Sequence, residues 1–159
     1  MTSIHLITQI KAPIQDVFDA ARNIDLHQNS AYQTHEKAIA GRTSGLIELG
    51  ETVTFRGKHF GLYLTHTSKI VKMEMPNFFV DEMIQGKFKS FKHLHFFEEK
   101  EGVTIMTDIL EYETPLGFLG KFFDILFLKK HLEKFLIERN QILKKLFENK
   151  NPKLLFRVF

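Results

Sequence analysis

The 159-residue sequence contains no cysteine and no tryptophan, and it has only four prolines. Without cysteine, disulfides, thiolate metal sites and a cysteine nucleophile are excluded. Long apolar runs are also missing, because Lys121 and Asp124 interrupt the best candidate for a membrane span, residues 117–128. The first residues show no basic segment followed by an apolar one, so we expect no signal peptide and a soluble, cytoplasmic protein.

Phenylalanine, in contrast, is abundant, with 17 residues, and 43% of the chain is hydrophobic. Together with a formal charge of only +3, this composition argues against disorder and predicts one sizeable core. We expect a single ligand-binding domain over residues 1–149 and a C-terminal tail over residues 150–159.

Positive charge is concentrated in the C-terminal third of the chain. Residues 121–159 hold ten Lys/Arg and four Asp/Glu, so this third carries +6 while the remainder is negative. A solvated helix face is the usual explanation. The alternative is a protein-interaction module or a transient contact with a membrane surface. No nucleic-acid partner is predicted, because no base-stacking motif accompanies the basic residues.

The spacing of apolar residues predicts an α+β domain. Residues 3–10 alternate as a strand, and residues 13–21 and 25–29 follow as two short helices. Residues 34–113 form a run of strands separated by short turns, which indicates an antiparallel meander. Residues 118–148 then form one long helix. Its apolar stripe needs an equally long partner, and a curved antiparallel sheet is the only one the chain offers. The stripe comprises Phe118, Phe122, Ile125, Leu128, Leu132, Phe135, Leu136, Ile142, Leu143 and Leu146.

Several segments resemble the SRPBCC superfamily, which includes START lipid-transfer domains, birch-pollen-allergen-like proteins and polyketide cyclases. The chain is most similar to a bacterial subgroup with members labelled cell-division inhibitor-like. The resemblance implies the helix-grip fold, in which a curved antiparallel sheet of six to seven strands surrounds a long C-terminal helix, with two short helices after the first strand. The segments are GETVTFR (50–56) with HFG (59–61), PNFFVD (76–81), GKF (86–88), HLHF (93–96), TIMTD (104–108) and PLGFLG (115–120).

The resemblance also implies a cavity between the sheet and the long helix, which members use for lipids, sterols, flavonoids, polyketide intermediates or quinones. With the phenylalanine-rich composition, it predicts a binding or carrier protein for a hydrophobic small molecule, more readily than an enzyme, with no cofactor and no metal. Residues 118–123 could form a mobile gate with hinges at Gly117 and Gly120. We expect a lining of apolar side chains: Phe55, Leu62, Leu64, Phe79, Met83, Phe91, Met106, Phe118 and Phe122.

His93 and His95 are the clearest polar feature, because residues i and i+2 of a strand point to the same face. Asp81 and Asp108, on the neighbouring strands, could lie beside them. Such a group could anchor the head of an apolar ligand or form a structural hydrogen-bond network. The group could also hold zinc or iron, an alternative that the sequence favours less. As acid and base it would instead serve a cyclase or dehydratase.

The remaining polar residues give weaker signals. We expect His59 to cap a turn at a strand corner. Glu36 or Glu51 could pair with Arg56 across strands, which would contribute little if exposed. Asp124, among phenylalanines, has no explanation in the sequence.

Overall fold

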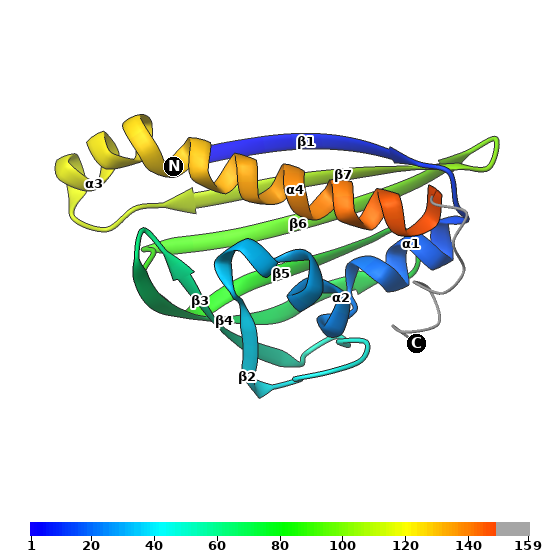
Figure 1. The fold of residues 1–159 in the computed structure, drawn as a ribbon, viewed down its shortest axis with the longest axis horizontal. Helices are drawn as coiled ribbons and strands as arrows, with labels where there is room; N and C mark the ends of the chain where they lie inside the picture. Colours follow the sequence, from blue (N-terminus) through cyan, green and yellow to red (C-terminus); the bar gives the residue numbers. More distant parts are fainter. Residues whose placement is uncertain (149–159) are drawn as a thin grey trace.

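The computed structural model describes residues 1–148, in which a curved antiparallel sheet lies against a long C-terminal helix (Figure 1). The predicted tail, residues 150–159, lies outside the described residues. The strands are β1 (Thr2–Ile10), β2 (Lys37–Gly41), β3 (Thr52–His59), β4 (Leu62–Glu74), β5 (Phe78–Gln85), β6 (Ser90–Lys100) and β7 (Val103–Glu113). The helical elements are α1 (Ile14–Ala21), α2 (Ile24–Ser30), η1 (Tyr32–Thr34), α3 (Gly117–Phe123), η2 (Asp124–Leu128) and α4 (Lys129–Glu148).

The sheet is a meander of β2 to β7, and β1 pairs with the last strand, β7, at its edge. Within residues 1–148 its seven strands follow the order β1-β7-β6-β5-β4-β3-β2, and each neighbouring pair is antiparallel. Register shifts near Ser68 and between Ile70 and Lys72 interrupt the β4–β5 pairing. Such bulges bend a strand and increase its twist. The helix-grip fold predicted from the sequence is therefore confirmed.

Two apolar clusters hold the helices against the sheet. At one end, Phe18 of α1 meets Phe79 and Phe97 edge-on, with ring centroids 5.6 and 5.3 Å away. Farther along, Leu132 and Leu136 of α4 belong to a second cluster, built on residues of β1 and β7. Each fully buried leucine or phenylalanine contributes about 1.5–3 kcal/mol relative to an exposed one. These clusters leave the middle of the concave face for the site described below.

The long C-terminal helix is present as predicted, but the first part of its predicted buried face is wrong. A π-type turn, η2, separates α3 from α4. From Leu128 onward the predicted stripe is buried or half-buried, but Phe118, Phe122 and Ile125 are 81%, 57% and 64% exposed. The reason is that α3 extends past the covering part of the sheet (Figure 1). None of the helices in residues 1–148 is long and apolar enough to cross a bilayer.

The buried face of α3 and η2 is instead made by Gly120, Asp124 and Leu128. Gly120 lies against the carbonyl of Pro115, and a Cβ atom on it would come within 1.8 Å of that oxygen. Asp124 accepts hydrogen bonds from the hydroxyls of Tyr112 and Thr2. Its carboxylate therefore fastens the start of the long helix to β7 and β1, which explains an acidic residue among phenylalanines.

Candidate functional site

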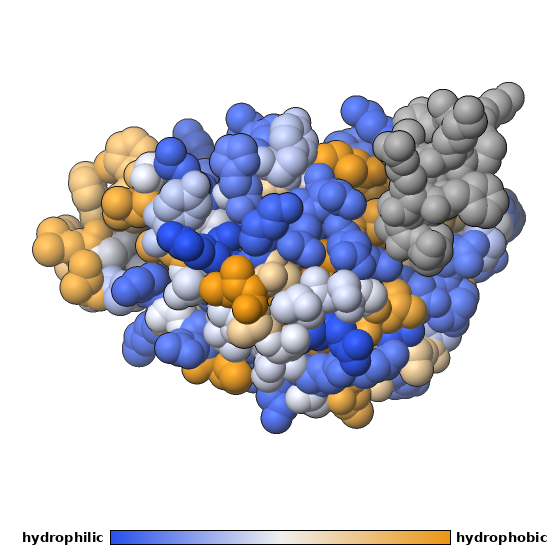
Figure 2. Space-filling view, turned by 60° about the horizontal axis from the view of Figure 1, so that its bottom comes forward, coloured by the Kyte–Doolittle hydropathy of each residue, from blue (hydrophilic) through white to orange (hydrophobic). Residues whose placement is uncertain are grey.

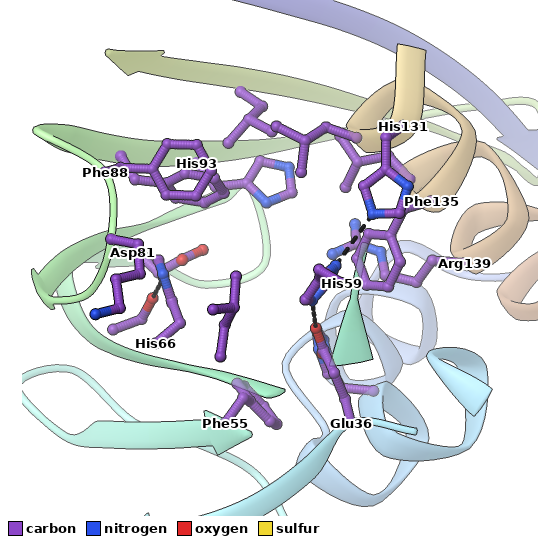
Figure 3. A pocket seen from close by; sticks show the side chains of 18 of the residues that line it. Glu36, Phe55, His59, His66, Asp81, Phe88, His93, His131, Phe135 and Arg139 are labelled. Atoms are coloured by element: carbon purple, nitrogen blue, oxygen red, sulfur yellow. Dashed lines mark hydrogen bonds and ion pairs between the residues drawn. The ribbon is translucent and has the colours of Figure 1, made fainter. Parts of the chain in front are cut away.

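A cavity of about 430 Å³ lies between the concave face of the sheet and α4. Its wall is mostly apolar, with polar side chains gathered in two places. Small-molecule sites in proteins have this size and this character. Figure 3 shows side chains converging on it from the sheet, from α4 and from the segment before β2.

The structure brings about half of the residues predicted for the site to this cavity. Those that line it are Phe55, Leu64, Phe79, Asp81, Phe91, His93 and His95. The others lie elsewhere: Leu62, Met83, Met106, Asp108, Phe118 and Phe122.

The predicted residues that do not line the cavity lie elsewhere for different physical reasons. Leu62 has the same orientation as Leu64 but sits at the outer end of β4, where it is 66% exposed. Met106 is fully buried in the core cluster beneath α1. Asp108 is also fully buried, behind the histidines that line the wall. Met83 packs towards Gly86, where a Cβ atom would meet its sulfur at 2.5 Å.

His93 and His95 form the first polar group, together with the two aspartates. Strand register puts His93 opposite Asp81, and His95 opposite Asp108. Nε2 of His95 lies 3.2 Å from Asp81 Oδ2, while its Nδ1 lies 2.9 Å from Asp108 Oδ1. Nε2 of His93 lies 3.0 Å from the same Asp108 oxygen. The imidazoles are 3.9 Å apart and almost fully buried.

Arg139 and Asn140 of α4 complete this group. Arg139 donates to Asp108 Oδ1 at 2.8 Å, and Asn140 donates to Oδ2 at 2.6 Å. Asn140 also donates to Thr8 Oγ1 on β1 at 3.2 Å. The sequence analysis missed both residues. The available signal was Asn140 itself, a polar residue that interrupts the apolar stripe between Leu136 and Leu143.

Burial and charge give the two histidines opposite behaviour. Burial and, to a lesser extent, the neighbouring His95 lower the pKa of His93 to about 4. Burial acts on His95 in the same direction, but the adjacent carboxylates of Asp108 and Asp81 outweigh it and raise the pKa of His95. The cluster therefore holds a neutral imidazole beside one that favours its proton.

The aspartates respond to these cations. Burial would raise the pKa of Asp81, but the hydrogen bond to His95 and the charges of both histidines lower it to about 2. Burial would also raise the pKa of Asp108, yet the charge of Arg139 and the contacts with both histidines hold that pKa well below its usual value. Two carboxylates thus face the guanidinium of Arg139 and the imidazole of His95, whose pKa is raised.

A second polar group lies across the cavity, where the predictions for individual residues were wrong. Glu36 contacts His27 at 2.8 Å and His59 at 3.5 Å, rather than Arg56. His59 is joined by a 3.1 Å hydrogen bond to His131 of α4 (Figure 3), so it is a cavity residue and not only a turn residue. Burial would raise the pKa of Glu36, but the hydrogen bonds from the histidines lower it to about 2.

Histidine is concentrated around the cavity. Six of the eight histidines in the chain line it: His27, His59, His66, His93, His95 and His131. They come from α2, β3, β4, β6 and α4, so no local sequence motif predicts that these histidines lie together. Burial lowers the pKa of both His66 and His131.

Asp81, His93 and His95 also offer three potential metal ligand atoms within 4.8 Å of one another. Two histidines and a carboxylate suit zinc or iron. However, the guanidinium of Arg139 lies 2.8 Å from the Asp108 oxygen that both imidazoles face. A cation is therefore already present beside these atoms, and it disfavours a second one.

No protein-family model matches this sequence. A search of curated proteins finds no match either. Solved structures, however, match the fold over nearly the whole chain.

Three examples illustrate that likeness. A START superfamily protein from Mycobacterium smegmatis is 11% identical, with a TM-score of 0.69 over 92% of this chain and 97% of the other. Ginseng major latex-like protein 151 from Panax ginseng is 17% identical, with a TM-score of 0.67 over 92% and 97%. A protein from Thermus thermophilus is 14% identical, with a TM-score of 0.70 over 89% and 97%. The predicted resemblance to the SRPBCC superfamily is thus confirmed at the level of the fold, the helix-grip fold.

Proposed function

We propose that this protein binds a hydrophobic small molecule in the cavity, as a binding or carrier protein. The observation that carries the proposal is the apolar cavity of about 430 Å³ with polar side chains gathered on two of its walls. An apolar wall provides affinity by burying the body of a ligand, while a few fixed polar groups orient it.

The polar groups indicate the kind of head group. Asp81 and Asp108 already have partners within the protein, His95 and Arg139. A charged head group would disturb these pairs and lose its hydration as well. A hydroxyl or carbonyl group could bond to the imidazole of His93 without that cost. Sterol-, quinone- and polyketide-like molecules carry such groups, so they fit the proposal better than a free fatty acid.

A cavity-filling substitution tests this function. Leu64→Trp adds volume inside the cavity, whereas Leu62→Trp adds it on the same face of β4, outside the cavity. Native mass spectrometry of the protein purified from its own host should show a co-purified apolar molecule. We expect Leu64→Trp to lose this molecule and to weaken binding of a quinone or sterol probe by about tenfold or more. Leu62→Trp should behave as the wild type; equal binding by both variants would contradict the proposal.

A second candidate function, an enzyme of the cyclase or dehydratase kind, is favoured by one observation. His93 and His95 lie 3.9 Å apart, and their pKa values are shifted in opposite directions. A base and an acid side by side are what proton transfer to and from a carbonyl compound requires. Incubation with polyketide-like substrates should then give a product that His93→Gln abolishes, while the same change only weakens probe binding because the apolar wall is intact. Absence of turnover in the wild type would leave only the binding function.

A further inference from the structure

One end of the molecule exposes an apolar surface, which we call the apolar tip. Its large side chains are between 56% and 81% exposed. Figure 2 shows hydrophobic residues gathered at the left end of the molecule, where Figure 1 places α3. Soluble proteins rarely leave so many neighbouring apolar side chains in water unless the surface meets a partner. The apolar tip comprises Leu116, Phe118, Leu119, Phe122, Ile125 and Phe127.

The exposed charges within the segment that forms the apolar tip have one sign. In residues 116–130, which the structure describes in full, the exposed charged residues are Lys121, Lys129 and Lys130. The one acidic residue of this segment, Asp124, is buried and bonded to Tyr112 and Thr2. Apolar side chains beside lysines are the composition of segments that lie in the interface of an anionic bilayer. Lysine stems can lie along the apolar surface while their ammonium groups reach lipid phosphates.

The exposure of the apolar tip is fixed by packing. Gly120 faces the Pro115 carbonyl, and Asp124 is bonded to β7 and β1, so these residues occupy the inner side of α3 and η2. The phenylalanines are left on the outer side. Rotating α3 to bury Phe118 or Phe122 would break both hydrogen bonds of a buried carboxylate, which is costly.

The apolar tip adjoins the cavity. Leu116 and Leu119 are 80% and 69% exposed, yet both also line the cavity, so the cavity reaches the surface here. The rings of Phe60 and Phe123, 5.3 Å apart, form another part of the same wall. A surface that meets lipid at this place would let an apolar ligand pass between membrane and cavity without crossing water.

We propose that the apolar tip docks into the surface of an anionic lipid bilayer, with the three lysines on the lipid head groups. The passage of ligand rests on the proposed cavity function, but docking itself does not. A second copy of the chain fits this surface less well. A twofold contact through the same patch would bring the lysines of both copies together, and like charges would oppose it.

Vesicle sedimentation tests the docking with matched variants. Wild-type protein should bind vesicles of phosphatidylcholine with phosphatidylglycerol, should bind phosphatidylcholine alone much less, and should be released by salt. The double variants Phe118→Ser/Phe122→Ser and Lys129→Glu/Lys130→Glu should each weaken this binding by about tenfold or more. The controls are Ile7→Ser, an apolar residue 71% exposed on β1, and Lys69→Glu/Lys72→Glu on β4. Both controls should bind as the wild type does.

Three results would overturn the docking proposal. The wild type could fail to bind anionic vesicles, or the tip variants could bind as well as the controls. Sedimentation velocity could also show a wild-type dimer that Phe118→Ser/Phe122→Ser converts to a monomer, which would assign the apolar tip to a second copy. Probe binding in solution separates this test from that of the cavity. Tip variants should retain it, while Leu64→Trp should lose it and still bind vesicles.

Discussion

His93 and His95 lie with their imidazoles 3.9 Å apart, yet the protein treats them as different groups. His95 lies between two carboxylates, and this raises its pKa, whereas burial holds the pKa of His93 at about 4. Asp81 has His95 as its hydrogen-bond partner, whereas Asp108 also has Arg139 and Asn140. The predictions below follow from this pair and from the side chains that connect it to α4.

Replacing His95 by Phe should destabilise the fold, although it preserves aromatic volume. Asp81 would lose the hydrogen bond from His95, and an unpaired buried polar group costs about 1–3 kcal/mol, whereas Asp108 keeps Arg139 and Asn140. Urea denaturation should show a lower midpoint with an unchanged slope. His5→Phe changes an exposed histidine on β1 and should leave the midpoint where it is. A variant His95→Phe as stable as the wild type would refute the role given to these contacts.

Acid should destabilise the protein through His93. Its pKa is about 4 in the folded protein and close to 6.5 when unfolded, so the unfolded chain binds the extra proton between these values. Stability must therefore fall as the pH decreases from about 6.5 to about 4, by up to about 1.4 kcal/mol per pH unit for one group. His66 and His131, whose pKa values are also lowered, add in the same direction.

The raised pKa of His95 contributes to the pH dependence of stability in the opposite direction. Its stabilisation is fully present below pH 6.5 and is lost as the pH rises through the raised pKa. His93→Gln should flatten the pH dependence between 4 and 6.5, whereas His5→Gln should not. Denaturation curves over a pH series measure this, and parallel profiles for wild type and His93→Gln would contradict it. Below about pH 4.5, Glu36 and Asp81 lose their own contributions, because their pKa values are lowered to about 2.

Arg139→Met should be more harmful than the loss of an exposed cation. It leaves Asp108 buried without its guanidinium partner, and breaking a buried pair typically costs about 3–5 kcal/mol. The double variant Asp108→Asn/Arg139→Met should recover part of that loss, because the buried charge is gone. Lys134→Met, on the exposed side of the same helix, is the control. Additive effects of the two single changes in a double-mutant cycle would show that the pair is not coupled.

Tyr112→Phe should loosen the attachment of the apolar tip. Asp124 would lose one of its two hydroxyl donors while remaining buried, for an expected loss of about 1–3 kcal/mol. Tyr32→Phe, at a tyrosine that is 59% exposed, should change stability by less than about 0.5 kcal/mol. Hydrogen exchange should show faster exchange in α3 and η2 of Tyr112→Phe than in β6. Uniform exchange across the chain would contradict a local role.

Periodicity was sufficient for the strands and for the order of elements, because each strand of a meander packs through its own alternating face. The same rule places His93 and His95 on the concave side. It failed for Phe118 and Phe122 because an apolar residue count does not reveal where the sheet stops covering the helix. Gly120 and Asp124 form the buried face there instead, and neither would be identified by its hydrophobicity.

The polar side of the cavity was harder to predict for a different reason. Glu36, His59, His131 and Arg139 come from separate parts of the chain, and their meeting depends on tertiary packing. The sequence analysis considered Glu36 and His59 only against their strand neighbours. Their true partners are His27 of α2 and His131 of α4, which are not strand neighbours.

The two attachments of the C-terminal helix determine which side of the cavity can open. Asp124 and Asn140, about 24 Å apart along the helix axis, are both bonded to β1 and β7. In residues 1–148, one side-chain hydrogen bond, His59–His131, joins α4 to the half of the sheet formed by β2, β3 and β4. The molecule thus has a hinge side along β1 and β7 and a latch side at the β3–β4 hairpin. The latch bond needs one imidazole nitrogen as its acceptor, whereas the hinge is held by hydroxyl, amide and guanidinium donors on two buried carboxylates.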